Sequence, residues 1–300
     1  MCGRGGSRAR AVVGALLACL LAGCAGGAET DASAGVITAA PVPAVQALVP
    51  EQVRARGTLT AVMSIGNAPL HYPAPDSSGH MLGVDPDLAK ALGETMGLRV
   101  NVVGVSFDQI VPGLQSGRYD LAVSQMAISP TRLKVLDFVE YMNSDTGLGT
   151  RAGNPLGLSA HALCGRLVGA SNGSVQQSSY LPTLSTQCTE QGKPPIGIRN
   201  FPDQQKAILA LVSGRVDGVF VDSPVIQYAA GRVPDIAVVD RFQGESSPAV
   251  GIGLNKGSTL TAAVQAGLAQ LSRDGVYDRI LAKWAVSSNG LSTFTVRKQP

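Results

Sequence analysis

A serine, a proline and an arginine stand where they could bind a small anion. Residues 129–132 read Ser-Pro-Thr-Arg, shortly after the apolar run Leu121–Val123. The run predicts a buried strand, and Ser followed by Pro predicts a helix start. First-turn N–H groups attract anions, and Arg132 can grip a carboxylate with two hydrogen bonds. An ordinary strand-to-helix junction with an exposed arginine has the same pattern, so this segment alone leaves both interpretations open.

A carboxylate, Asp222, ends a second apolar run and is followed by another Ser-Pro pair. Both runs follow the same short pattern: a Ser-Gly pair (116–117 and 213–214), a basic residue, one intervening residue and an aspartate. Gly commonly ends helices, so shared turn chemistry could account for the repeat. Its occurrence twice, each time before a candidate ligand residue, indicates two lobes of related architecture.

These residues must be positioned by alternating strands and helices, which predict open sheets with helices on both faces. Predicted strands are Thr58–Ser64, Arg99–Val105, a run from Leu121, Gly165–Ser171, Ile196–Phe201, Val216–Asp222 and Ala249–Asn255. Predicted helices are Asp85–Gly97, Phe107–Gly117, one from about Val175, Asp203–Gly214, one from Ser223, Leu260–Asp274 and Val276–Trp284.

Composition excludes several classes of function. Charged residues make up 15% of the 300 residues and hydrophobic residues 45%, unlike a disordered or nucleic-acid-binding chain. The net charge of +3 comes from Arg4, Arg8 and Arg10, and 21 basic residues then balance 21 acidic ones. This neutrality argues against a polyanion partner such as nucleic acid. The three histidines lack ligand spacing and there is no C-x-x-C motif, so we expect neither metal nor cofactor.

The N-terminus predicts export. A basic stretch precedes the apolar run Ala11–Ala22, which is too short to span a bilayer. The sequence Leu21-Ala22-Gly23-Cys24 resembles a bacterial lipobox, so residues 1–23 would be a lipoprotein signal peptide and Cys24 the lipidated first residue. A plain secretory signal with an incidental cysteine is the alternative. Residues 24–52, rich in Ala, Gly, Pro, Ser and Thr, predict a flexible tether.

Two cysteines, Cys164 and Cys188, remain after this processing. In an exported protein a disulfide is the natural interpretation, and closing a loop of about 25 residues would contribute roughly 3.5 kcal/mol. Two free thiols are the alternative.

Several motifs, in order, resemble the bacterial extracellular solute-binding proteins of family 3, the polar amino-acid-binding components of ABC importers. The resemblance runs from about Arg54 to Trp284. Its motifs are Arg56-Gly-Thr-Leu, Gly83-Val-Asp-Pro-Asp-Leu-Ala, residues 107–120 from Phe-Asp-Gln to Arg-Tyr-Asp, Ile128-Ser-Pro-Thr-Arg132, Asp137-Phe138 with Tyr141, Asp217-Gly-Val-Phe-Val-Asp222-Ser-Pro, Gly251-Ile-Gly-Leu and residues 274–284 from Asp-Gly-Val to Lys-Trp.

The resemblance implies an α/β fold of the type II periplasmic-binding-protein kind, with two lobes, two hinge crossings and the ligand between the lobes. Lobe 1 would comprise residues 53–146 plus 247–300, and lobe 2 residues 147–246. The crossings would fall near 142–147 and 246–251.

The resemblance also implies the roles of single residues. Arg132 matches the arginine that binds the ligand α-carboxylate, and Asp222 the carboxylate that receives the α-ammonium. A buried cation needs such a partner. Phe107 matches an aromatic wall of the side-chain pocket, although alone it could be core, as Asp222 alone could be a helix cap. The other candidate binding residues are Ser64, Asn67, Ser124, Gln125, Ala127, Ser129, Ser171, Ser174 and Val175.

The function implied is a lipid-anchored receptor on the outer face of the cell membrane that delivers a small, polar α-amino acid to the permease of an ABC importer. The loop 64–72 lacks the aromatic that the family often has at the Leu70 and Asn67 positions, and Ser64, Asn67 and Gln125 add polarity, which favours a polar ligand. Two alternatives stand beside it: a sensor that signals to a membrane partner, and a dehydratase-like enzyme on the same scaffold. We expect a monomer without catalytic residues.

Overall fold

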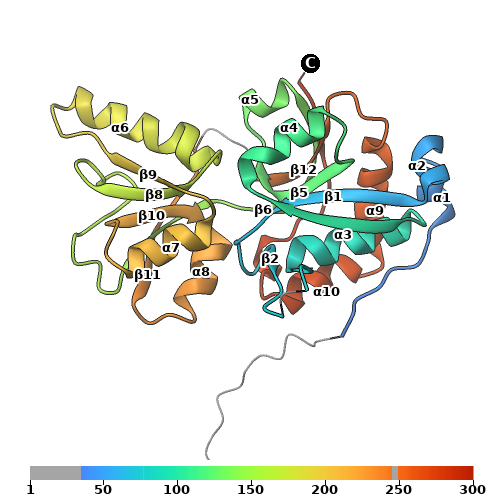
Figure 1. Ribbon diagram of the computed structural model, residues 1–300, viewed down its shortest axis with the longest axis horizontal. Coiled ribbons are helices and arrows are strands. Elements are labelled where there is room, and N and C mark those ends of the chain that lie inside the picture. Colours follow the sequence, from blue (N-terminus) through green and yellow to red (C-terminus); the bar gives the residue numbers. More distant parts are fainter. Residues whose placement is uncertain (1–34, 77, 245–248, 300) are drawn as a thin grey trace, which may run out of the picture. The chain divides into compact units, whose positions relative to one another are not determined.

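The structure is a computed structural model that describes residues 35–76, 78–244 and 249–299. Two large sheets organise this part of the chain, beside a small sheet of two strands, β2 and β3 (Figure 1). One has six strands in the order β13-β6-β12-β5-β1-β4, and the other has five in the order β11-β7-β10-β8-β9. We call the first sheet with its helices lobe 1 and the second lobe 2.

The bounds of the elements are as follows. The strands are β1 (Thr58–Ser64), β2 (Tyr72–Pro73), β3 (Met81–Leu82), β4 (Arg99–Val105), β5 (Leu121–Ala127), β6 (Leu136–Asn143), β7 (Thr146–Arg151), β8 (Leu167–Ser171), β9 (Gly197–Phe201), β10 (Gly218–Asp222), β11 (Ile236–Phe242), β12 (Ala249–Asn255) and β13 (Val296–Arg297). The helices are α1 (Pro43–Gln46), α2 (Glu51–Arg56), α3 (Val84–Thr95), α4 (Ile110–Gln115), α5 (Pro130–Leu133), α6 (Leu181–Glu190), α7 (Gln204–Val212), α8 (Ser223–Ala230), α9 (Thr261–Arg273) and α10 (Val276–Lys283).

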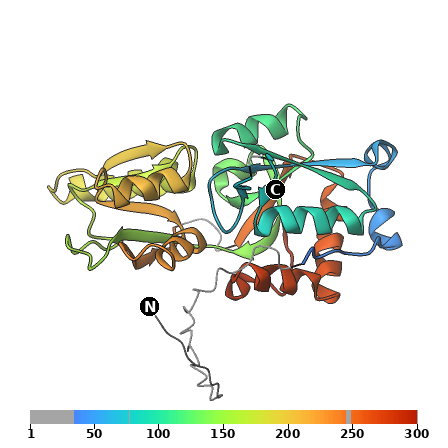
Figure 2. The ribbon, with the colours of Figure 1, turned by 60° about the horizontal axis from the view of Figure 1, so that its bottom comes forward.

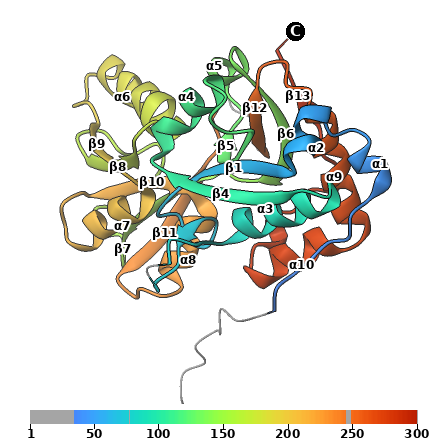
Figure 3. The ribbon, with the colours of Figure 1, turned by 45° about the vertical axis from the view of Figure 1, so that its right-hand side comes forward.

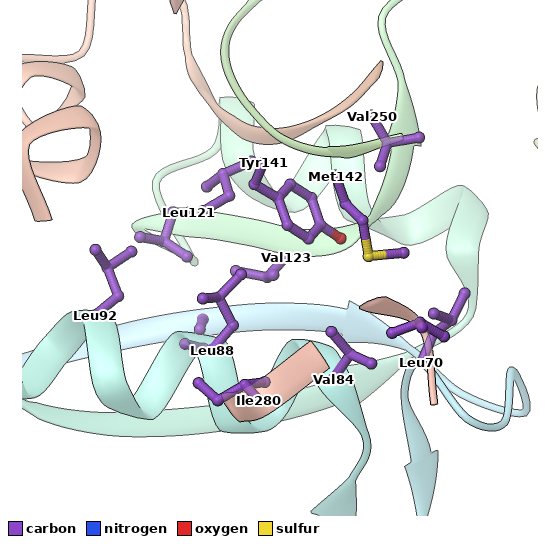
Figure 4. Close-up of a cluster of buried hydrophobic side chains, with 14 of the residues drawn as sticks. Leu70, Val84, Leu88, Leu92, Leu121, Val123, Tyr141, Met142, Val250 and Ile280 are labelled. Atoms are coloured by element: carbon purple, nitrogen blue, oxygen red, sulfur yellow. The ribbon is translucent and has the colours of Figure 1, made fainter. Parts of the chain in front are cut away.

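Lobe 1 is a sheet buried on both faces. In β5, Leu121 and Val123 belong to the cluster formed with α3, α9 and α10, whereas Ala122 and Met126 belong to the cluster formed with α4. This alternation follows from the two-residue period of a strand. Figures 2 and 3 show α3, α9 and α10 together, and in Figure 4 Leu88 of α3 lies beside Val123.

Lobe 2 follows the same plan. In β10, Val219 and Val221 pack in the cluster that contains α7 and α8, whereas Phe220 packs in the cluster that contains α6. Strands β8, β9 and β10 are parallel, and β7 runs antiparallel to both β10 and β11. Helices on both faces of each sheet were predicted from the alternating pattern, and the fold class is confirmed.

The repeated Ser-Gly pattern has the same structural role in both lobes. Gly117 and Gly214 follow the ends of α4 and α7 with φ values of 71° and 72°. Asp120 Oδ2 then accepts a hydrogen bond from Thr60 N (2.7 Å), and Asp217 Oδ2 accepts one from Leu167 N (2.9 Å). Each aspartate thus fixes its own strand against the neighbouring parallel strand.

Residues 144–145 join β6 of lobe 1 to β7 of lobe 2, inside the predicted crossing 142–147. The chain returns between β11 and β12. The predicted second crossing, 246–251, lies partly outside the described residues.

The segment before β1 differs from the prediction. A tether through residue 52 was expected, but α1 and α2 form there, and Val45 and Val49 are buried in the lobe 1 core. Val42 N donates to Thr95 O (2.9 Å). Pro43 at the first helical position and apolar residues at 42, 45 and 49 give this segment a helix start and an apolar stripe. Its Ala- and Pro-rich composition concealed that spacing.

Two other predicted elements are less regular than expected. The helix predicted over Phe107–Gly117 is a 3₁₀ turn, Phe107–Gln109, followed by α4. The helix predicted from Val175 begins as a π-helical turn, Gln176–Tyr180, before α6. The remaining predicted helices and strands form within a few residues of their expected bounds, whereas β6, β7 and β11 had not been predicted as strands.

Candidate functional site

A pocket lies between the lobes, at the carboxyl ends of β5, β8 and β10. Nine of the twelve predicted binding residues line it: Asn67, Phe107, Gln125, Ala127, Arg132, Ser171, Ser174, Val175 and Asp222. The other lining residues are Ser144, Asp145, Thr146, Gln176, Tyr180, Gln204, Phe242, Gln243 and Val250. The crossing 144–145 therefore forms part of the wall.

Arg132 reaches from lobe 1 to lobe 2. Its Nη1 donates to Ala127 O (2.9 Å) and its Nη2 to Gly173 O (3.1 Å), and the guanidinium carbon lies 5.1 Å from the centre of the Phe107 ring. Burial lowers the pKa of Arg132 to about 10, although Asp222 opposes this shift. The side chain remains a cation at neutral pH, with its planar fork held at the pocket.

The helix start beside Arg132 is a weaker anion site than predicted. Helix α5 has four residues, and Ser129 Oγ accepts a hydrogen bond from Arg132 N (3.3 Å) while Leu133 N donates to Ser129 O. The N–H groups of Arg132 and Leu133 are therefore already paired. Ser129 acts as the predicted cap but does not line the pocket, whereas Arg132 does.

Asp222 lies at the end of β10 in lobe 2 and is held by two amide side chains. Gln176 Nε2 donates to its Oδ1 (2.9 Å), and Gln204 Nε2 donates to its Oδ2 (2.7 Å). Gln204 Oε1 also accepts from Asp222 N (2.8 Å). Burial raises the pKa of Asp222, whereas the hydrogen bonds from Gln204 and Gln176 act in the opposite direction. The carboxylate is therefore held in place. Burying its charge is unfavourable, and a bound cation would offset this unfavourable free energy.

Gln176 and Gln204 were not predicted as site residues. The signal that could have found Gln204 is its place directly after Asp203, which caps α7 by accepting from Lys206 N (2.8 Å). Gln176 had no comparable signal, because it stands in the π-helical turn.

Two predicted site residues, Ser64 and Ser124, lie beneath the pocket and do not line it. Ser64 N donates to Ser124 Oγ (2.9 Å), and Ser124 Oγ donates to Ser64 Oγ (3.1 Å). Ser64 Oγ also lies 2.8 Å from His71 Nε2 and accepts from Asn67 Nδ2 (2.8 Å). These hydroxyl groups support the floor of the pocket through Asn67.

A fully buried polar cluster, which had not been predicted, continues this floor. His71 Nδ1 lies 2.6 Å from Asp85 Oδ2, and Tyr141 Oη donates to Asp85 Oδ1 (2.7 Å). Tyr141 Oη accepts from Gln125 N (3.1 Å) and Gln125 Nε2 (2.9 Å). Burial, with Asp85 second, raises the pKa of Tyr141 well above its usual value, so its hydroxyl keeps its proton.

Gln125, which lines the pocket, has one buried acceptor without a partner. Its side chain is 5% exposed, its φ is 47°, and its Oε1 has no hydrogen-bond partner. Tyr141 Oη already donates to Asp85, so it can only accept from the Gln125 amide, which fixes Nε2 toward Tyr141 and leaves Oε1 on the other side. A buried acceptor without a donor is costly.

The second-lobe turn after β8 lies across from Arg132. Ser174 Oγ donates to Ser171 O (2.7 Å) and accepts from Gln177 N (3.2 Å), so this hydroxyl holds the turn together. Ser171 and Val175 line the pocket beside it. This turn also carries Gly173, whose carbonyl meets Arg132.

Cys164 and Cys188 form a disulfide with a Cα–Cα distance of 5.5 Å, which confirms the predicted pairing. It ties the segment before β8 to α6 within lobe 2.

In the described part of the chain no group of three or more His, Cys, Asp or Glu residues could hold a metal ion. No helix in the described ranges is long and apolar enough to cross a membrane.

Two α/β lobes joined by crossing segments, with a pocket between their strand ends, define the class of type II periplasmic binding proteins. Within this class, the chain belongs to the bacterial extracellular solute-binding proteins of family 3, whose family model matches residues 59–287. It is therefore an extracytoplasmic solute receptor, as the sequence motifs predicted.

Similar proteins bind amino acids. The arginine-binding protein ArgT of Corynebacterium glutamicum is 30% identical over 260 residues, which cover 87% of this chain and 84% of the relative. The structure of the amino acid ABC transporter substrate-binding protein AbpA of Streptococcus pneumoniae, bound to L-arginine, is 26% identical with a TM-score of 0.69 and covers 79% of this chain and 99% of its own. The ancestral amino-acid-binding protein AncCDT-1, a precursor of cyclohexadienyl dehydratase, is 30% identical with a TM-score of 0.66 and covers 78% and 98%.

Proposed function

We propose that this receptor binds an L-α-amino acid and delivers it to the membrane permease of an ABC importer. One observation carries the proposal: a fixed guanidinium from lobe 1 and a fixed carboxylate from lobe 2 line the same pocket. An α-amino acid carries the two complementary charges on one carbon. Arg132 would bind its carboxylate and Asp222 its ammonium, with the turn Ser171–Val175 beside the carboxylate and Phe107 against the side chain.

The pocket favours a ligand side chain that donates hydrogen bonds. Among the described residues that line it, Arg132 is the only cation, so an acidic side chain would have no partner. The free Oε1 of Gln125 needs a donor, and Asp145 adds a second carboxylate to the wall. Guanidinium, ammonium and amide groups meet this requirement. The arginine-binding relatives make L-arginine the first ligand to test, followed by lysine and glutamine.

We further propose that binding is not followed by a reaction. A general acid or base must exchange a proton near its working pH. Asp222 paired with an ammonium and two amide donors would instead stay ionised. One of the similar structures is a precursor of a dehydratase, so the absence of a reaction has to be tested. The bound ligand should be recovered unchanged, and a product would show that the chain is an enzyme.

The N-terminal proposals lie outside the described residues. We propose that residues 1–23 are a signal peptide and that Cys24 is lipidated, which would place a monomeric receptor at the outer face of the cell membrane. A Cys24→Ser variant should then leave the membrane fraction, with an unchanged ligand affinity. If Cys24→Ser keeps both its ligand affinity and its membrane retention, the proposed lipid anchor is wrong, and the proposed receptor function is unaffected.

Calorimetry of the chain from residue 36 onward, titrated with each of the common L-amino acids, tests the function. We expect binding to wild type and to Arg99→Ala, an exposed control on β4, and at least a hundredfold weaker binding to Arg132→Ala. Absence of binding to wild type at millimolar ligand would overturn the receptor proposal. Binding that survives Arg132→Ala would overturn the role of Arg132 only.

A further inference from the structure

The N-terminus of α7, in lobe 2, is completed by residues of lobe 1. The first N–H groups of a helix have no partner within it and must find one elsewhere. In α7, Lys206 N donates to its own cap, Asp203 Oδ1 (2.8 Å). Gln204 N instead donates to Asn67 Oδ1 (3.3 Å), and Gln205 N donates to Gly66 O (3.0 Å). Both of these acceptors belong to the loop after β1.

Asn67 is held in the orientation that this contact requires. Its Nδ2 donates to Ser64 Oγ (2.8 Å) and lies 2.7 Å from His71 Nε2. An amide nitrogen only donates, so His71 Nε2 accepts and the ring carries its proton on Nδ1, toward Asp85. The asparagine is 4% exposed and its oxygen is thereby turned to lobe 2.

Gly66 allows the close approach of the two lobes. Its φ is 79°, and a Cβ at this position would lie 2.5 Å from Asp203 Cγ and 2.7 Å from Asp203 Oδ1. A side chain here would therefore collide with the cap of α7 where the lobes meet. Gly117 has a similar φ of 71° but open space around it.

The same end of α7 holds the candidate ammonium acceptor. The backbone N–H of Gln204 donates to Asn67 Oδ1. Its side-chain amide donates to the Asp222 carboxylate and accepts from the Asp222 backbone N–H. We propose that Asn67 is a positioning residue that couples contact between the lobes to ligand capture, by completing α7 from lobe 1 and so steadying the Gln204–Asp222 pair. The inference rests on the proposed role of Asp222. It assigns to the 66–67 loop a function besides lining the pocket.

Dissociation of the bound amino acid tests this proposal. The probe is L-arginine, or the tightest-binding L-amino acid if arginine does not bind. In Asn67→Ala, loss of the hydrogen bond between the lobes, together with the two that Asn67 makes within lobe 1, should speed dissociation about tenfold while the association rate stays close to wild type. Asn101→Ala, on the exposed edge strand β4, is the matched control and should match wild type.

Two variants at position 204, used as backgrounds for Asn67→Ala, isolate the contribution of the Gln204 backbone N–H. Gln204→Ala and Gln204→Pro both lose the side chain, but only proline lacks the N–H, and proline is tolerated at the first position of a helix. Asp203 before it is already extended, with φ −150° and ψ 169°, as a residue before proline should be. Asn67→Ala should accelerate dissociation less in the alanine background than in wild type, because the Gln204–Asp222 pair is already lost, and least in the proline background, where the N–H donor is lost as well.

Gly66→Ala gives an independent readout. It should weaken binding more than tenfold relative to Gly117→Ala, which shares the backbone strain without the collision. If wild type binds, two results would overturn the coupling. One is an equal dissociation rate for Asn67→Ala and wild type, and the other is an equal acceleration by Asn67→Ala in both Gln204 backgrounds. If wild type binds no amino acid, the proposed function fails, and the coupling fails with it.

Discussion

Replacing Asp222 by asparagine separates ligand recognition from folding. The substitution keeps the size of the side chain but removes its charge. Asparagine can still accept from Gln204 with its oxygen, but its nitrogen then faces Gln176 Nε2, which is also a donor and is tied to Thr146 Oγ1 (3.1 Å). The ligand ammonium loses its ionic partner in a partly buried site. Breaking such a pair costs about 3–5 kcal/mol, so affinity should fall by at least about a hundredfold.

The stability of the unliganded protein should respond differently. Burial raises the pKa of Asp222 in the folded chain, so the folded state binds this proton more tightly than the unfolded state does. At neutral pH the ionised carboxylate therefore opposes folding. Removing the charge offsets the new contact between two donors, which costs about 1–3 kcal/mol at most. We expect the melting temperature of Asp222→Asn to lie within a few degrees of wild type.

Calorimetric titration and a thermal melt, run side by side, measure the two effects. Asp278→Asn, on the exposed side of α10, is the control for loss of one negative charge and should match wild type in both. Asp222→Asn with an affinity within threefold of wild type would refute the role of the carboxylate. A loss of binding accompanied by a large fall in melting temperature would show that Asp222 is needed for the fold instead.

Three further predictions follow from the site and from lobe 2. Arg132→Lys keeps the charge but loses the planar fork, so titration should show affinity about 10- to 100-fold weaker, and an unchanged affinity would argue against two-point recognition. Affinity should decline as the pH falls through the pKa of Asp222 in the free protein, which lies above the ordinary value of 3.8; calorimetry between pH 7 and pH 4 should show this decline in wild type and not in Asp222→Asn. Exchanging Cys164 and Cys188 for serine should lower the free energy of unfolding by about 3.5 kcal/mol in denaturant titrations while leaving affinity unchanged, and equal stability would refute the loop-closure account.

The sequence predicted the sheets and both charged ends of the site because those features are local. A buried strand, a Ser-Pro start and a Gly end are each written in a few consecutive residues, as at Leu121, Ser129 and Gly117. Strand β6 was missed because Asp137 and Glu140 interrupt its apolar residues, which therefore form neither a continuous apolar run nor a sustained alternation.

What lies beneath the pocket could not be predicted in the same way. His71, Asp85 and Tyr141 come from three separate elements, and only the folded sheet brings them into contact. Asn67 and Gln204 are 137 residues apart, and one of the two contributes its backbone N–H, which every residue except proline carries. No residue type marks such a contact in a sequence.

The paired aspartates Asp120 and Asp217 have a mechanical consequence. Each fixes the register of two parallel strands at their amino ends, whereas the pocket lies at the carboxyl ends. A slip of one residue would turn every side chain of the strand to the wrong face. Because each register is fixed in this way, we expect each lobe to move as a rigid body, with angular change confined to the segments that join them. Substitution of Asp120 or Asp217 should therefore make a whole lobe less rigid. Ligand binding would weaken, because Arg132 and Asp222 would no longer be held at a fixed separation.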